Sequence, residues 1–232
     1  MLTVQDLAGG YGGSQVLFGM SFEAGEGEVI ALIGRNGMGK TTTVKTVMGM
    51  LPARGGQVSF RGKPLERLAP SVVARLGVGL VPEGRRVFGS LTVEENLLAT
   101  ARREPGRDSW DLKRVYALFP RLLERRKQSA RTLSGGEQQM LVVGRALMTN
   151  PHLLILDEAT EGLAPLIRQE IWSCLRQLKT EGQTILVIDK NLPEMATLVD
   201  RHYIVEKGTV VWSGSPAALQ QEAGLASRYL GV

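Results

Sequence analysis

Residues 34–41 have the residue types and the spacing needed to bind phosphate groups. The segment Gly34-Arg-Asn-Gly-Met-Gly-Lys40-Thr41 matches the spacing G-x-x-x-x-G-K-[ST] and lies between an apolar run and a helical pattern. Glycines leave backbone N–H groups bare at a helix start, Lys40 supplies a positive charge, and the Thr41 hydroxyl can ligate Mg²⁺. The residues predicted to contact a nucleotide here are Gly34, Arg35, Asn36, Gly37, Met38, Gly39, Lys40, Thr41 and Thr42.

Two acids, Asp157 and Glu158, follow the apolar run 153–156. Ligands of α/β sheets bind at the carboxyl ends of the strands, so these acids are predicted to face the phosphate loop. Asp157 is predicted to hold Mg²⁺, directly or through water, and Glu158 to act as general base toward an attacking water. An Asp-Glu pair alone indicates only a turn; beside a phosphate loop it favours phosphoryl chemistry.

A second helix start with bare backbone donors lies in Leu133-Ser-Gly-Gly-Glu-Gln-Gln139. Ser134 and Glu137 have the spacing of a capping box, which explains a helix start without any ligand. Gly135 and Gly136 also expose N–H groups to a possible phosphate. One nucleotide held between two chains would use both this helix start and the phosphate loop.

Alternating strand and helix patterns must position these residues. Apolar runs rich in β-branched residues predict strands over 28–33, 77–81, 153–156, 184–188 and 203–205. Periodic patterns predict helices over 40–48, 93–103, 137–148 and 167–179. This alternation indicates an α/β fold with a mostly parallel sheet. Short Gly-punctuated strands before residue 30 and at 56–62 predict a small antiparallel piece, and residues 91–148 predict a helical insertion.

The composition excludes several classes of protein. The chain has 232 residues, 43% of them hydrophobic and 22% charged, which is ordinary for a globular protein large enough to bury a core. One cysteine and two histidines exclude a disulfide scaffold and a Cys- or His-rich zinc site. There is no apolar run of membrane-spanning length, and residues 1–6 lack the pattern of a signal peptide, so we expect a cytosolic protein.

Positive charge is concentrated in residues 101–131. This basic segment has ten Lys or Arg and four Asp or Glu, a net charge of +6, whereas the whole chain carries +5. The segment could lie near anionic lipid headgroups, or it could simply be a solvated helical face. No interleaved aromatic residues support the binding of single-stranded nucleic acid, and no nucleic acid partner is predicted.

The phosphate loop, the Leu-Ser-Gly-Gly-Glu-Gln-Gln segment and the acidic strand end that follows it together resemble the ATP-binding-cassette ATPases. The resemblance spans essentially the whole chain. It implies a P-loop NTPase (RecA-like) core, a single ATPase domain over 1–232 with a helical subdomain inserted at about 88–150, and ATP with Mg²⁺ as ligands. It also implies that Tyr11, in the loop Gly9-Gly-Tyr-Gly-Gly13, stacks on adenine. Two cassettes would close head to tail, so that Ser134, Gly135, Gly136 and Glu137 of one chain meet the ATP of the other.

Departures from the usual cassette pattern indicate a branch of that family. Glu83 stands where the family usually has glutamine, Lys190 where it usually has the histidine that senses the γ-phosphate, and Ala164 where many members have aspartate. By this resemblance Glu83 is assigned to Mg²⁺ and Lys190 to the catalytic set. Pro-Glu-Gly-Arg, Glu-Gly-Leu-Ala-Pro, the non-His triplet at 189–191 and the Tyr229-Leu-Gly ending resemble the smaller ATPase subunit of branched-chain amino acid importers.

That resemblance implies an ATP-hydrolysing subunit at the cytoplasmic face of the membrane. Its partners would be transmembrane permease subunits, met through the groove beside residues 83–88 and the helical insertion, a second ATPase subunit, identical or related, and, indirectly, an extracytoplasmic binding protein. Importers of urea, amides or other amino acids are alternatives, and Lys190 leaves open a regulatory cassette that only binds ATP. A DNA-repair cassette would need coiled coils or zinc modules, a ribosome-associated one would normally need two cassettes, and a soluble P-loop kinase would not explain Leu-Ser-Gly-Gly-Glu.

Overall fold

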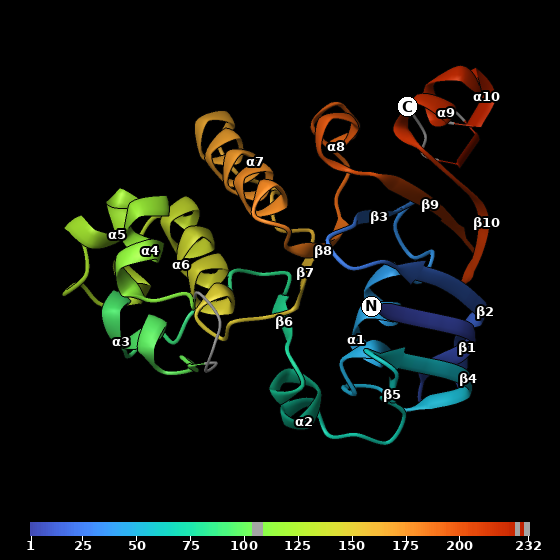
Figure 1. Cartoon of the computed structure of the whole chain (residues 1–232), viewed down its shortest axis with the longest axis horizontal. Helices are drawn as coiled ribbons and strands as arrows, with labels where there is room; N and C mark the ends of the chain where they lie inside the picture. Colours follow the sequence, from blue (N-terminus) through green and yellow to red (C-terminus); the bar gives the residue numbers. More distant parts are fainter. Residues whose placement is uncertain (104–108, 226–227, 230–232) are drawn as a thin grey trace.

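The computed structural model describes residues 1–103, 109–225 and 228–229, and Figure 1 shows two β-sheets with a group of helices to one side. The strands are β1 (Leu2–Tyr11), β2 (Ser14–Ala24), β3 (Val29–Ile33), β4 (Ala53–Phe60), β5 (Lys63–Pro64), β6 (Val78–Val81), β7 (Leu153–Asp157), β8 (Thr184–Ile188), β9 (Arg201–Glu206) and β10 (Thr209–Gly214). The helices are α1 (Lys40–Val47), α2 (Pro70–Arg75), α3 (Val93–Leu98), α4 (Leu112–Leu118), α5 (Pro120–Glu124), the 3₁₀ turn η1 (Ala130–Thr132), α6 (Gly135–Leu147), α7 (Pro165–Thr180), α8 (Leu192–Leu198), α9 (Pro216–Gln221) and α10 (Ala223–Leu225).

The larger sheet carries the phosphate loop at its centre. Its strand order is β10-β9-β3-β8-β7-β6, and β3 pairs in parallel with both β9 and β8. The pairs β7–β8 and β6–β7 are also parallel, and only β10 runs antiparallel, at one edge. The predicted mostly parallel α/β sheet is therefore confirmed.

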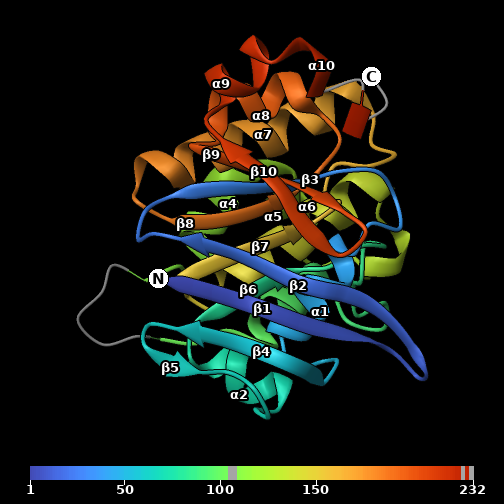
Figure 2. The same cartoon turned by 90° about the vertical axis from the view of Figure 1, so that its right-hand side faces the viewer.

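The smaller sheet has the order β2-β1-β4-β5 and is antiparallel throughout. Figure 2 shows it beside the larger sheet, with β5 and α2 at its outer end. This confirms the predicted antiparallel piece formed by the N-terminal residues and the segment around 56–62.

Both faces of the larger sheet are covered, which explains why its central strands are almost entirely apolar. Every residue of β3, β7 and β8 is buried. Ile30 and Leu32 join the core that includes Val44 of α1 and the smaller sheet, whereas Ala31 and Ile33 join the core on the opposite face. Because alternate residues of β3 face opposite cores, the core shared by Ile30, Leu32 and Val44 fixes the position of α1 and of the loop that precedes it.

The chain between β6 and β7 forms helices α3 to α6, which Figure 1 places together, away from the smaller sheet. Within this group α3 and α5 both pack on α6. The helical insertion is thus present. The prediction that residues 1–232 act as one ATPase domain with 88–150 as its subdomain stays a prediction.

Three helix boundaries differ by two residues or more from those predicted, and one of them is the start of α7, which lies at Pro165 rather than at 167. The helix predicted over 93–103 ends at Leu98, because Arg102 N donates to Met148 O at 2.9 Å and the Arg102 guanidinium to Arg75 O at 3.0 Å. These tertiary bonds replace the helical ones. Helix α6 begins at Gly135 rather than at 137, because its cap is Ser134.

The predicted glycine-rich loop around Tyr11 is mostly strand. Gly9, Gly10 and Tyr11 belong to β1, where Gly10 faces Gln15 and Tyr11 faces Ser14 of β2. Only the two residues between the strands form the hairpin turn. Tyr11 is therefore held at the end of a strand pair.

Candidate functional site

The loop between β3 and α1 places free backbone donors where a phosphate can bind. Gly39 is the N-cap of α1 and offers no side chain to the first N–H groups of the helix. Those groups need an external acceptor, and the positive end of the helix dipole favours an anion. This helix start has the geometry of a phosphate cradle, and contact of its residues with a nucleotide stays a prediction.

Lys40 spans this loop from inside. Its Nζ donates to Gly34 O at 2.8 Å and Arg35 O at 3.0 Å, and the residue is 5% exposed. Burial, the largest cause, lowers the pKa of the Lys40 ammonium, while the carboxylates of Glu158 and Asp157 act in the opposite direction. Because both acceptors are neutral carbonyls, the charge of Lys40 is held in place but remains available to a phosphate.

The outer side of the loop rests on the β9–β10 hairpin. Gly34 has a φ of 149°, and a Cβ on it would lie 2.3 Å from Val205 O. Gly208 N donates to Met38 O at 3.0 Å, and Lys207 N points at Met38 Sδ at 3.3 Å. No residue with a side chain fits at Gly34 without moving β9, which is why glycine stands there.

A cavity of about 400 Å³ joins the phosphate loop to three predicted residues from elsewhere in the chain. Its walls bring together Tyr11, Glu83 and Glu158 with Gly37, Gly39, Lys40, Thr41 and Thr42. Tyr11 is 44% exposed, and Lys45 Nζ lies 5.8 Å from its ring centroid. A half-exposed aromatic ring and a glycine-rich helix start that line one cavity suit a nucleotide.

Thr41 and Asp157 form an oxygen pair in this region. Thr41 Oγ1 donates to Asp157 Oδ1 at 3.1 Å, and burial, the largest cause, raises the pKa of Asp157. A hydroxyl and a carboxylate are hard oxygen ligands of the kind Mg²⁺ prefers, and Mg²⁺ usually takes few protein ligands beside phosphates and water. The described residues contain no cluster of three or more His, Cys, Asp or Glu that could hold a metal ion. Glu83 lines the same cavity, and Lys45 Nζ lies 4.0 Å from its Oε1.

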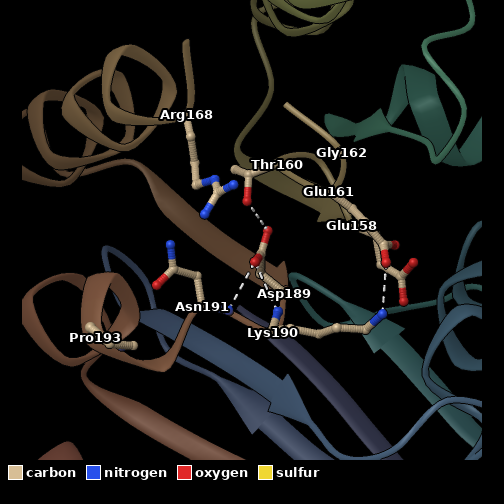
Figure 3. Close-up of a pocket in the computed structure, with 9 residues that line it drawn as sticks. All are labelled: Glu158, Thr160, Glu161, Gly162, Arg168, Asp189, Lys190, Asn191 and Pro193. Atoms are coloured by element: carbon tan, nitrogen blue, oxygen red, sulfur yellow. Dashed lines mark hydrogen bonds and ion pairs between the residues drawn. The ribbon is translucent and has the colours of Figure 1, made fainter. Parts of the chain in front are cut away.

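Glu158 shares its surroundings with Glu161 and Lys190, as Figure 3 shows. The hydrogen bond to Glu161 is the largest of the causes that raise the pKa of Glu158 to about 7, followed by burial and the charge of Glu161. Lys190 Nζ pairs with Glu161 Oε1 at 2.7 Å. Glu158 has a φ of 50°, and its N–H donates to Ile188 O at 2.9 Å, which ties the end of β7 to the end of β8.

Asp189 organises the loop after β8. Its Oδ1 accepts from the N–H groups of Lys190 at 2.8 Å and Asn191 at 3.0 Å, and its Oδ2 accepts from Thr160 Oγ1 at 2.6 Å. Figure 3 shows these bonds at the side of a second cavity, of about 350 Å³, that also reaches Glu158. The sequence did not predict these contacts of Asp189 and Glu161. Its only signal was an acidic residue close to the end of a predicted strand.

The predicted second anion site is a well-formed helix start. Glu137 N donates to Ser134 Oγ at 3.3 Å, Ser134 N donates to Glu137 Oε2 at 2.8 Å, and Arg125 pairs with Glu137 at 2.5 Å. Neither Ser134, Gly135 nor Gly136 lines either of the two cavities just described. Contact of these residues with a nucleotide on another chain stays a prediction.

Part of the basic segment is neutralised by carboxylates from outside it. Arg114 pairs with Glu181 at 2.8 Å, Arg121 with Glu170 at 3.5 Å, and Arg125 with Glu137. Of the remaining residues in the segment, Arg107, Glu104 and Asp108 lie outside the described residues, as do Leu230 and Gly231 of the Tyr229-Leu-Gly ending. Across the part of the chain that is described, no helix is long and apolar enough to span a bilayer.

Comparisons with known proteins agree with this geometry. The family model described as ABC transporter matches residues 17–161. The chain is 43% identical, over 100% of both sequences, to the high-affinity branched-chain amino acid transport ATP-binding protein BraG of Pseudomonas aeruginosa. It is 31% identical to the lipopolysaccharide export system ATP-binding protein LptB of Escherichia coli, over 99% of this chain and 97% of that protein. A solved structure of the ATP-binding subunit of an ABC transporter has a TM-score of 0.85 and 30% identity, covering 100% of this chain and 96% of the other.

Proposed function

We propose that this chain, which belongs to the ABC transporter family and hydrolyses ATP, drives import of branched-chain amino acids through a separate permease. The observation that carries the catalytic part is the cavity in which Lys40 and Thr41 meet Tyr11, Glu83 and Glu158. Phosphoryl transfer needs charge neutralisation, positioning and an oriented nucleophile, and this set offers all three.

We assign the phosphates of ATP to the loop that runs from Gly34 through Arg35, Asn36, Gly37, Met38 and Gly39 to Lys40, Thr41 and Thr42. The bare N–H groups at the start of α1 and the ammonium of Lys40 support this assignment. Tyr11 is assigned to adenine, because its half-exposed ring lines the same cavity as the phosphate loop.

Thr41, Asp157 and Glu83 are the residues that would hold Mg²⁺. Oxygens of Thr41 and Asp157 lie 3.1 Å apart, and Glu83 lines the cavity that Thr41 also lines. Bound there, the ion would neutralise charge on the β- and γ-phosphates.

Glu158 is proposed as the general base. With its pKa raised to about 7, it can accept a proton from the attacking water near neutral pH more readily than an ordinary carboxylate. Lys190 is proposed to place positive charge near the γ-phosphate, and it must leave Glu161 to do so. Lysine supplies charge without titrating near neutral pH, unlike the usual histidine.

A second ATPase subunit, identical or related, would complete the site with its own Ser134, Gly135, Gly136 and Glu137 or their equivalents. The start of α6 lines neither cavity of its own chain, and its two glycines place no side chain over the first N–H groups, which supports this proposal. We propose that the whole chain acts as one ATPase domain, and that residues 83–88 and the helices of 88–150 meet the permease at the cytoplasmic face of the membrane. An extracytoplasmic binding protein would act only through that permease.

The cargo and direction rest on the relatives. Full-length identity of 43% to a branched-chain amino acid transport protein favours that cargo over lipopolysaccharide export, for which the identity is 31%. Importers of urea, amides or other amino acids remain alternative outcomes of the test, as does a regulatory cassette that binds ATP without hydrolysing it.

The test is uptake by vesicles that contain the assembled transporter, with ATP inside and labelled leucine, glutamine or urea outside with the binding protein. We expect ATP-dependent uptake of leucine, and Glu158→Gln should lose turnover while keeping ATP binding. Uptake of urea or glutamine instead of leucine would overturn the assignment of branched-chain amino acids as the cargo. Equal turnover of the wild type and Glu158→Gln would overturn the catalytic role of Glu158.

A further inference from the structure

One arginine in the loop between β6 and α3 contacts two distant segments of the site. Arg85 Nη2 donates to Gly162 O at 3.0 Å, in the loop after β7. Its Nη1 lies 2.1 Å from where a Cβ of Gly135 would be, at the start of α6. A single guanidinium therefore rests on the backbone of the second anion site and also holds the loop that follows Glu158.

The surroundings of Arg85 indicate that this placement is specific. Arg85 adopts a φ of 51°, a left-handed conformation that non-glycine residues seldom take. None of the described carboxylates forms an ion pair with it. Its charge also lies beside the positive end of the α6 dipole, an unfavourable position for a cation unless an anion comes there.

The same short loop reaches the chain's own nucleotide cavity. Glu83, two residues before Arg85, lines the cavity with Lys40 and Thr41. A displacement of this loop therefore acts on both the nucleotide cavity of its own chain and the surface offered to the nucleotide of a second chain.

We propose that Arg85 is a positioning residue for ATP hydrolysis: it holds the start of α6 and the loop after β7 in the arrangement that the second chain's nucleotide requires. This inference rests on the proposed two-chain site. Through Glu83, Arg85 also links the loop assigned to the permease with both nucleotide positions. The forked guanidinium is essential to it, because a lysine has one nitrogen and can reach only one of the two segments.

The test compares Arg85→Lys and Arg85→Ala with Arg176→Ala in the assembled transporter. Arg176 of α7 is the matched control, because it forms an ion pair with Glu194 of α8 at 2.9 Å and lines neither cavity. We expect both Arg85 variants to lower kcat about tenfold with ATP affinity of the isolated chain unchanged, because misplaced groups cost rate rather than ground-state binding. Wild-type kcat in Arg85→Ala, full activity in Arg85→Lys, or a loss confined to ATP affinity would overturn the proposal.

A double substitution separates this role from general destabilisation. Gly135→Ala places a methyl group against Nη1, so its cost should be smaller in an Arg85→Ala background than in the wild type. Fold losses that simply multiply would mean that the two residues act independently, and would also overturn the proposal. If ATPase turnover responds as expected but leucine is not taken up, the cargo assignment fails and the role of Arg85 stands; if Glu158→Gln retains turnover, the assignment of the base fails separately.

Discussion

Replacing Glu161 by glutamine should shift the pH dependence of hydrolysis toward acid. Glu161 raises the pKa of Glu158 to about 7 by a hydrogen bond and by its charge, together with burial, while Lys190 and Lys40 lower it. Glutamine keeps the size of the side chain but removes the charge, and its amide can donate to an ionised Glu158. The variant therefore favours the ionised base at lower pH.

The size of the effect follows from the two pKa values. With a pKa of about 7, Glu158 is roughly half ionised at pH 7 and roughly 9% ionised at pH 6, whereas a carboxyl at its ordinary 4.5 would be almost fully ionised at both. Relative to its own alkaline plateau, kcat/KM should then rise up to about tenfold at pH 6 and about twofold at pH 7. Tenfold is the upper limit, because the contribution of burial remains in the variant.

The assay is kcat/KM of the assembled transporter between about pH 5.5 and 9, because that ratio reports the groups of the free enzyme. Lys190→Met should move the acid limb in the opposite direction, since Lys190 lowers the pKa of Glu158. Glu170→Gln is the control, because it loses an ion pair with Arg121 and lines neither cavity. An acid limb of Glu161→Gln that stays within about 0.3 pH unit of the wild type, or that moves to higher pH, would refute the reasoning.

Other predictions concern single groups. Burial lowers the pKa of His202 from 6.5 to about 4, so as the pH falls the unfolded chain binds a proton at this side chain before the folded chain does. The unfolding free energy should therefore fall by about 3 kcal/mol between pH 6.5 and pH 4. Urea unfolding should show this slope flattened in His202→Phe; an equal slope would contradict it. Cys174 is the only cysteine and is buried, so thiol reagents should label it only in denaturant, and rapid labelling of the native chain would show that its helix opens. Reversing Arg126 and Lys127 to Glu should weaken binding to anionic vesicles at low salt, by about 1 kcal/mol for each basic residue lost. Arg125 is not changed in this variant, because it forms an ion pair with Glu137. Unchanged vesicle binding would show that the basic segment is only a solvated face.

Local chemistry is sufficient to predict the sheet and the glycine-rich start of α1. Residues 34–39 form the loop between β3 and α1, residues 40 and 41 begin α1, and all five predicted strands of the larger sheet are present. Short-range patterns determine these features, because a glycine-rich helix start and a buried apolar strand carry their cause within a few neighbouring residues. The capping box at Ser134 also placed the start of α6 correctly, although periodicity alone began that helix two residues later.

Contacts between distant segments account for what sequence reasoning missed. Nothing near Arg85 indicates that it meets Gly162, and nothing near Glu161 indicates that it pairs with Lys190. The end of α3 depends on Arg102, whose backbone N–H donates to Met148 O at the end of α6. In each case the partner lies far along the chain, so local propensity contains no trace of it.

The hairpin behind the phosphate loop bears on how the protein is made. β9 and β10 contribute no residue to the nucleotide cavity, yet Gly34 lies against Val205, and Met38 is held by Lys207 and Gly208. On the ribosome the chain emerges from its N-terminus, so the phosphate loop appears early but lacks this support until residue 208 has been made. A growing chain therefore lacks this backing for its phosphate loop until the β9–β10 hairpin has been synthesised, and we expect ATP binding to appear only with that hairpin.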